Sequence, residues 1–144
     1  MTLVELLVVL GIIGVIVGMS VPGLVGYAQR VRLKATVRQV MGLLSLARSL
    51  AISSHEEHAV ILDQAEGTLS VMNVASEETL EQAVHLSSAV TLVFEIGGEP
   101  SAEARIIFRP TGALNGRTVS LILADREREQ TITVTGTTGA ISLQ

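Results

Sequence analysis

The first 21 residues form one apolar run whose only charged side chain is Glu5. As a helix rising about 1.5 Å per residue, residues 3–21 extend roughly 28 Å, close to the hydrocarbon thickness of a bilayer. A secretory signal would show a basic start, a shorter apolar core and a small-residue cleavage site, and none is present in that form. The pattern therefore predicts a retained helix that is long enough to span a membrane.

Glu5 is the exceptional position in this run. A charge at the centre of a spanning helix costs about 2.5 to 3.5 kcal/mol and usually has a partner. No Lys or Arg precedes Arg30 in the sequence. Two interpretations follow: Glu5 stabilises the start of its own helix through the helix dipole, or it pairs with the α-amine of another copy and sets the axial offset between subunits.

Glycine and proline interrupt the second half of the run. The spacing Gly14-x-x-x-Gly18 allows close approach of helices in apolar surroundings. Pro22 removes the amide that would bond the carbonyl of Gly18, and its ring crowds that turn. The segment 14–23 is therefore predicted to bend or to lose its helix; an ordinary kinked transmembrane helix is the alternative.

From Gly26 the pattern becomes amphipathic and continues to about Ser53. Apolar residues recur every three or four positions, which indicates one buried helix face, while the basic side chains fall off that stripe. A helix of some 50 residues exceeds the usual length in globular domains and is expected to project beyond its own domain. The stripe consists of Leu33, Val37, Val40, Leu44, Ala47 and Ala51.

After His58 the apolar positions alternate with polar ones, which is typical of strands. The fold class predicted is α+β, with a long helix at 1–54 packed on an antiparallel β head at 55–144. Ser76 to Ala83 is ambiguous between a short helix and a loop, and Asp63 to Gly67 is expected to be a hairpin turn. Candidate strands are His58 to Leu62, Thr68 to Val74, Val90 to Ile96, Arg105 to Phe108, Thr118 to Leu123, Thr131 to Thr135 and Ala140 to Leu143.

Composition narrows the function classes. Beyond Ser54 acidic residues outnumber basic ones thirteen to five, and only three aromatic residues occur in the chain, so no nucleic-acid partner is expected. There is no cysteine, which excludes disulfides and thiolate sites.

His55 and His58 have a spacing that suits a metal on one helical turn, but a solvated helix end is favoured. We predict no catalytic residues, no metal and no cofactor; the chain is not expected to be an enzyme.

The N-terminal sequence T-L-V-E-L-L-V-V-L-G-I-I-G, with Glu5 and a closing Pro22, resembles the mature N-terminus of type IV pilins and type II secretion pseudopilins. The resemblance implies that a prepilin peptidase removes a basic leader and N-methylates residue 1. Met1 stands here where Phe is usual. The resemblance also implies that Glu5 contacts the amine of a neighbouring subunit and that the helix around Gly14, Gly18 and Pro22 melts in the filament.

A second resemblance narrows the family. Phe108-Arg-Pro-Thr-Gly112, two following strands and a closing Gly139-Ala-Ile-Ser resemble the C-terminal half of GspH/FimT-like minor pseudopilins. Ala140 replaces the usual Arg of the closing motif, and the basic C-terminal region of the DNA-uptake members is absent. The resemblance to major pseudopilins fails at this end of the chain, because residues 136–144 carry no acidic side chain that would ligate calcium.

The resemblances imply a filament protein, and they leave its role open. The first interpretation is a structural subunit of a type IV pilus-like or type II secretion pseudopilus filament. The alternative is a low-copy minor pseudopilin that initiates the tip and contacts secreted substrate; a monomeric, membrane-anchored periplasmic domain is a weaker third.

Expected partners are other copies, other pilins or pseudopilins, the prepilin peptidase and the assembly platform. The expected location is the inner membrane with a periplasmic head before assembly, although the bases at residues 30–38 alone would orient the chain oppositely.

Overall fold

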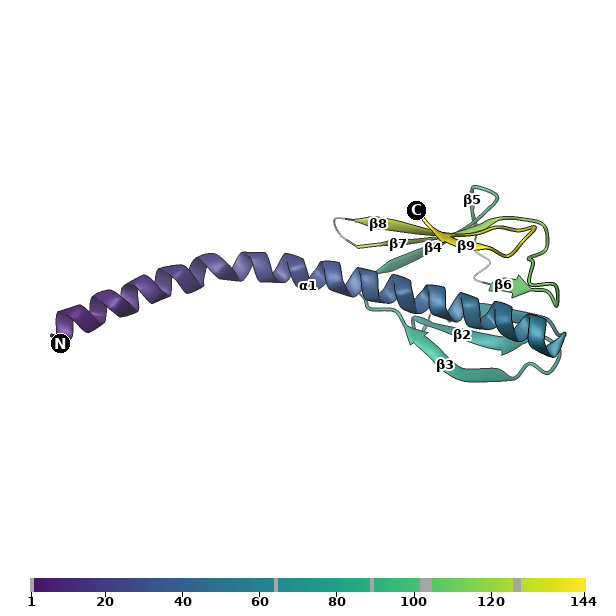
Figure 1. Ribbon diagram of the computed structural model, residues 1–144, viewed down its shortest axis with the longest axis horizontal. Helices are drawn as coiled ribbons and strands as arrows, with labels where there is room; N and C mark the ends of the chain where they lie inside the picture. The colour runs from purple at the N-terminus through teal and green to yellow at the C-terminus, as the bar shows by residue number, and fades with distance from the viewer. Residues whose placement is uncertain (1, 64, 89, 102–104, 126–127) are drawn as a thin grey trace. The chain divides into compact units, whose positions relative to one another are not determined.

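The structure is a computed structural model that describes residues 2–63, 65–88, 90–101, 105–125 and 128–144, with the side chains of 19–30, 81 and 82 left undescribed. It divides into two compact units, residues 1–32 and 33–144. One long helix, α1 (Leu3–Ser54), contributes to both units (Figure 1). The predicted division into 1–54 and 55–144 stays a prediction.

The first unit consists of the N-terminal part of α1. The backbone is helical from Leu3 onward and stays helical through residues 14–23. The loss of helix that we predicted there concerns the assembled filament, and it stays a prediction. Over the residues described, no helical stretch combines the length and hydropathy of a membrane span. The predicted span is thus not shown by the structure.

In the second unit α1 lies against the head with the face that the sequence indicated. All six residues of the apolar stripe are buried, and Val40, Leu44, Ala47 and Ala51 have no exposed surface. The hydroxyls of Ser53 and Ser54 donate to the carbonyl of Leu50, and His55 follows with a φ of 58°. A residue in this left-handed conformation is a common way to end a helix. The predicted helix end and buried face are confirmed.

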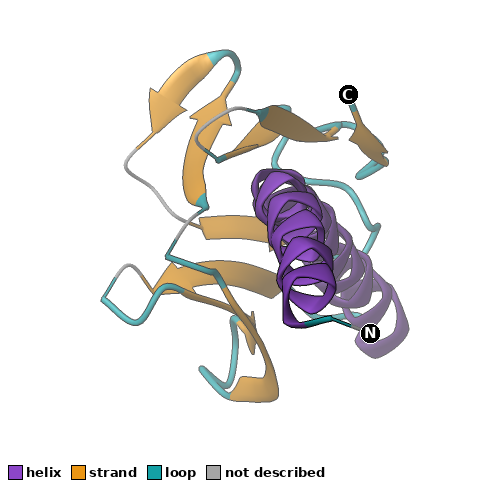
Figure 2. Cartoon of the chain, turned by 90° about the vertical axis from the view of Figure 1, so that its left-hand side faces the viewer, coloured by secondary structure: helices purple, strands orange, loops and turns teal. Residues whose placement is uncertain are grey.

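The head contains two antiparallel sheets, and its strands lie beside the helix in Figure 2. The first sheet has the order β3-β2-β1-β6 and the second the order β5-β4-β7-β8-β9. Every described pairing is antiparallel. The strands are β1 (His58–Asp63), β2 (Thr68–Asn73), β3 (Thr79–His85), β4 (Thr91–Ile96), β5 (Glu99–Ser101), β6 (Arg105–Phe108), β7 (Val119–Ala124), β8 (Glu129–Val134) and β9 (Ile141–Leu143).

One hydrophobic core joins the helix stripe to both sheets. Along β7 buried and half-buried positions alternate over the whole strand, because successive side chains point to opposite faces. Phe108 from the first sheet and Leu121 from the second are fully buried in the same cluster as Leu44. The head is therefore held together through the helix as well as through its strand ladders.

The strand prediction is right at seven places and incomplete at two. The seven predicted strands are present with small shifts at their ends, and β6 has the predicted bounds. Of the segment Ser76 to Ala83, residues 76–78 are a loop, which was one of the two alternatives, and β3 begins at Thr79. β5 was not predicted. At the predicted hairpin turn, Asp63 accepts the N–H groups of Ala65 and Glu66, and Gly67 has a φ of 63°.

Candidate functional site

The start of α1 carries a reciprocal pair of hydrogen bonds between Thr2 and Glu5. The Thr2 N–H donates to Glu5 Oε2, and the Glu5 N–H donates to Thr2 Oγ1, both at 3.3 Å. This is a capping box, in which two side chains satisfy backbone donors at a helix start. In the single chain Glu5 therefore takes part in the start of its own helix, and its role in assembly stays a prediction. Met1, whose amine that role requires, lies outside the described residues.

The next turns of α1 expose a large apolar surface, which we call the apolar sleeve. Its exposed fractions run from 48% at Val9 to 82% at Leu3. A helix that is hydrophobic on all sides is normally buried in protein or lipid, and contiguous patches of this kind mark interaction sites. The sleeve consists of Leu3, Val4, Leu6, Leu7, Val8, Val9, Leu10, Ile12, Ile13, Val15, Ile16 and Val17.

Gly14 and Gly18 lie within the apolar sleeve and contribute no side chain to its surface. A Cβ added at either position would meet no atom within 4 Å. The two glycines are four residues apart, so they lie on one helix face, where a second helix can approach closely. The side chain of Pro22 is outside the described set, and its part in helix melting stays a prediction.

The head has a second organised feature, the contact of Arg48 with two loops. Its Nε donates to the carbonyl of Gly112 at 3.2 Å, and its NH2 group donates to the carbonyl of Thr138 at 2.9 Å. The sequence analysis grouped Arg48 with the basic side chains outside the apolar stripe and did not predict its contacts with these loops. The signal available was the pair of turn motifs at Gly112 and Gly139, but nothing local connects them with Arg48.

The histidines do not come together as a metal site. His55 is exposed at the helix end, whereas His58 is 4% exposed on β1, with its Nδ1 3.2 Å from the carbonyl of Glu56. Among the described side chains no group of three or more His, Cys, Asp or Glu could hold a metal ion.

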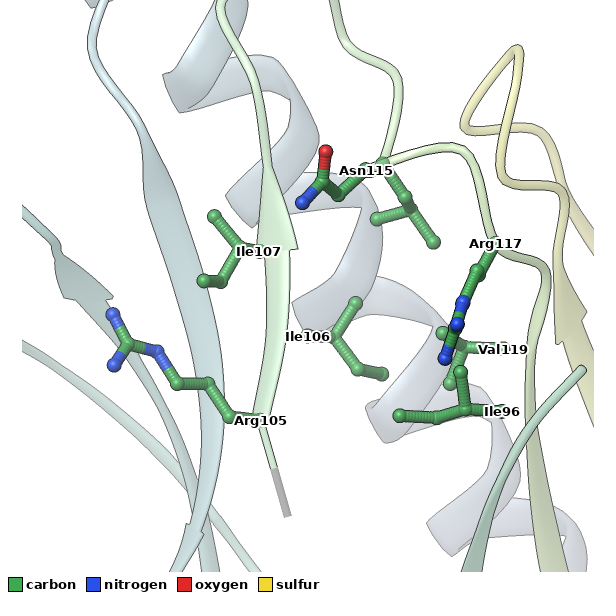
Figure 3. Close-up of a pocket in the computed structure, with 8 residues that line it drawn as sticks. Ile96, Arg105, Ile106, Ile107, Asn115, Arg117 and Val119 are labelled. Carbon is green, nitrogen blue, oxygen red and sulfur yellow. The ribbon is translucent and has the colours of Figure 1, made fainter. Parts of the chain in front are cut away.

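A groove of about 410 Å³ opens between β6 of the first sheet and the second sheet. Figure 3 shows Ile106 directed toward Ile96 and Val119, with Asn115 and Arg117 at the rim. Arg105 and Ile107 leave β6 on the opposite side from Ile106 (Figure 3). The lining therefore combines apolar side chains with two arginines, Arg105 and Arg117.

Solved structures with a similar fold are minor pilins and pseudopilins. The minor pilin FimU of the type IV system of Pseudomonas aeruginosa PAO1 aligns with a TM-score of 0.67 at 16% identity, covering 82% of this chain and 92% of that one. The minor pseudopilin EpsH of the type 2 secretion system of Vibrio cholerae aligns with a TM-score of 0.58 at 19% identity, covering 78% and 96%. A comparison with curated protein sequences gives no match.

The fold is thus similar to that of a type IV minor pilin and of a minor pseudopilin. Residues 36–138 match the family model described as type II transport protein GspH, and this range covers most of the chain. The chain belongs to the GspH family. The resemblance found in the C-terminal sequence motifs is confirmed.

Proposed function

We propose that this chain is a filament subunit that polymerises through the apolar sleeve, in a type II secretion pseudopilus or a type IV pilus-like filament. The observation that carries the proposal is the sleeve itself: twelve large apolar side chains about half exposed or more, on a helix that leads into a GspH-family head. Burying this surface between subunits removes it from water, at about 25 cal/mol per Å² of apolar area. Gly14 and Gly18 provide the face where neighbouring helices approach most closely.

Glu5 gives the assembly its register in this proposal. Among the described residues of the single chain, its carboxylate accepts an exposed, long hydrogen bond of 3.3 Å from Thr2, which is a weak partner for a full charge. The α-amine at Met1 of an adjacent subunit offers a charged donor, and charge-assisted hydrogen bonds are roughly twice as strong as neutral ones. Transfer of Glu5 from the capping box to that amine would fix the axial offset between subunits.

Before assembly, the sleeve needs a different apolar environment. The 21-residue apolar run suits insertion in the inner membrane, with the head in the periplasm. Processing by a prepilin peptidase, N-methylation at Met1 and delivery by an assembly platform belong to the same proposal. Melting of the helix around Pro22 during assembly would let subunits adjust their spacing.

A second candidate function is a low-copy subunit at the filament tip that contacts secreted substrate. Both similar solved structures are minor subunits, a minor pilin and a minor pseudopilin, and the family match is to GspH. The two candidates differ in abundance. Counting this chain per filament in sheared, purified filaments by quantitative mass spectrometry separates them, because a structural subunit occurs along the whole filament and a tip subunit occurs about once. Absence of the chain from purified filaments would contradict both.

A further inference from the structure

β6 is the last strand in the described order of its sheet, which leaves a free edge along this strand. The Val74 N–H donates to the carbonyl of Glu57, which fixes the residues of β1 that bond β2. Hydrogen-bonded pairs alternate along an antiparallel ladder, so the backbone groups of Arg105 and Ile107 point away from β1. Arg109 agrees with this alternation, since its N–H donates into the following turn. Within the described residues no strand pairs with this edge.

The two faces of β6 offer different surroundings to an added strand. Ile106 is buried and points into the groove with Ile96 and Val119 (Figure 3). Arg105 and Ile107 are half-buried on the other face. Successive side chains of a strand point to opposite faces. A strand laid along β6 would therefore direct apolar residues into the groove and its alternate residues toward Arg105.

One nitrogen of the Arg105 guanidinium, Nε, lacks a hydrogen-bond partner among the described atoms. This nitrogen is buried. Buried polar groups nearly always have partners, and an unmade bond to a charged group costs more than one to a neutral group. A carboxylate on a strand added at the free edge of β6 would accept a hydrogen bond from this Nε–H and pair with the guanidinium charge.

The charge of the head also selects an acidic occupant. Both charged side chains that line the groove are arginines, Arg105 and Arg117, although acidic residues outnumber basic ones thirteen to five beyond Ser54. Arg117 is exposed at the rim of the groove, and the Arg109 guanidinium is bonded to the side chain of Asn115 beside it. The groove thus carries basic side chains on an acidic head, and it complements negative charge.

We propose that this groove binds an extended, acidic segment of a partner protein, which adds a strand to the free edge of β6. Backbone hydrogen bonds along the edge would give affinity, and the groove and Arg105 would select alternating apolar and acidic side chains. The proposal does not depend on filament assembly, because it concerns the head alone. A second copy of the chain is the competing occupant.

The first test measures peptide binding to the detergent-solubilised full chain by fluorescence anisotropy. The probe is a short labelled peptide that alternates valine with glutamate. One control replaces glutamate with lysine, and another carries N-methyl groups on alternate backbone amides, which blocks strand pairing. The proposal expects saturable binding of the glutamate peptide and at least about tenfold weaker binding of both controls. No binding of the glutamate peptide, or equal binding of the lysine peptide, overturns it.

Variants locate the binding to the edge of β6. Ile107→Pro removes an edge N–H without touching the ladder to β1, and proline is tolerated at such positions; Ile107→Ala keeps the N–H and is the matched control. Arg105→Glu should reverse the preference toward the lysine peptide. Circular dichroism melts show that each variant is folded. Unchanged peptide binding in Ile107→Pro, or self-association of the wild-type chain that Arg105→Glu abolishes, overturns the proposal, the latter in favour of a second copy.

Discussion

The guanidinium of Arg48 on α1 joins the helix to the carbonyl of Gly112, 64 residues further along the chain, through a 3.2 Å hydrogen bond from Nε. The same side chain donates to Thr138, so one arginine fixes two loops to the helix. Both loops follow strands of different sheets, β6 and β8. Arg48 therefore connects α1 to one loop of each sheet.

Removing this arginine should destabilise the head. Hydrogen bonds to charged groups contribute about 1.5 to 3 kcal/mol each, but Arg48 is partly exposed, so we expect Arg48→Ala to cost about 2 kcal/mol in total, less than two such bonds would contribute when buried. Arg38→Ala is the matched control, because Arg38 is exposed on the same helix. Denaturant unfolding of the detergent-solubilised chain measures both. Equal stability of the two variants would show that the loops hold their positions without Arg48.

Gly139→Ala should destabilise the head through steric overlap. Gly139 has a φ of 64°, and a Cβ there would overlap the carbonyl oxygen of Gly112. Gly116→Ala separates the two causes, since Gly116 also has a positive φ, 83°, but has open space around it. We expect the strain of a left-handed alanine alone, about 1 kcal/mol, at Gly116, and a clearly larger loss at Gly139. Similar melting temperatures for the two variants would rule out the overlap.

A charge placed on the buried face of α1 should unfold the head. Leu44 has no exposed surface, so Leu44→Asp buries a charge without a partner and should unfold the head, at a cost of several kcal/mol. Ser45→Asp is the control on the neighbouring, exposed position. Near-ultraviolet circular dichroism and thermal melts follow the head. A native melt for Leu44→Asp would disprove the packing.

The prediction of the fold from the sequence succeeded where local pattern decides the structure. The stripe from Leu33 to Ala51 repeats at helical spacing, and burial follows directly from that period. β3 was missed because its residues, T-L-E-Q-A-V-H, include glutamate and alanine, which are depleted in strands. β5 has only three residues and contains Pro100, so pairing with β4 rather than propensity makes it a strand.

The candidate site was less predictable because its contacts join distant residues. Arg48 bonds partners 64 and 90 positions away, and no periodicity encodes such a pair. The groove at β6 depends on which strand lies at the edge of the sheet, and strand order was not predicted. Glu5 was predicted as a special position from its isolation in an apolar run. Its bond to Thr2 follows the T-x-x-E spacing, which was readable in the sequence but was not used.

Pro22→Ala tests the predicted melting of the helix. Alanine restores the amide that proline lacks and favours helix by about 3 kcal/mol at an interior position. Filaments of the variant should be stiffer, with a longer persistence length in negative-stain micrographs than wild-type filaments. A cryo-electron microscopy map of wild-type filaments with unbroken helical density over residues 14–23 would contradict the melting.

The amount of filament formed by Glu5→Gln, without a wild-type copy, tests the central claim most directly. Glutamine keeps the size of the side chain and still completes a capping box with Thr2, so only the charge is lost. Thr2→Ala is the complementary control, because it removes the threonine half of that box and keeps the Glu5 carboxylate. We predict that Glu5→Gln lowers sheared filament sharply at normal cellular protein levels, while Thr2→Ala lowers it much less. Wild-type amounts of filament from Glu5→Gln would contradict the assembly role of Glu5.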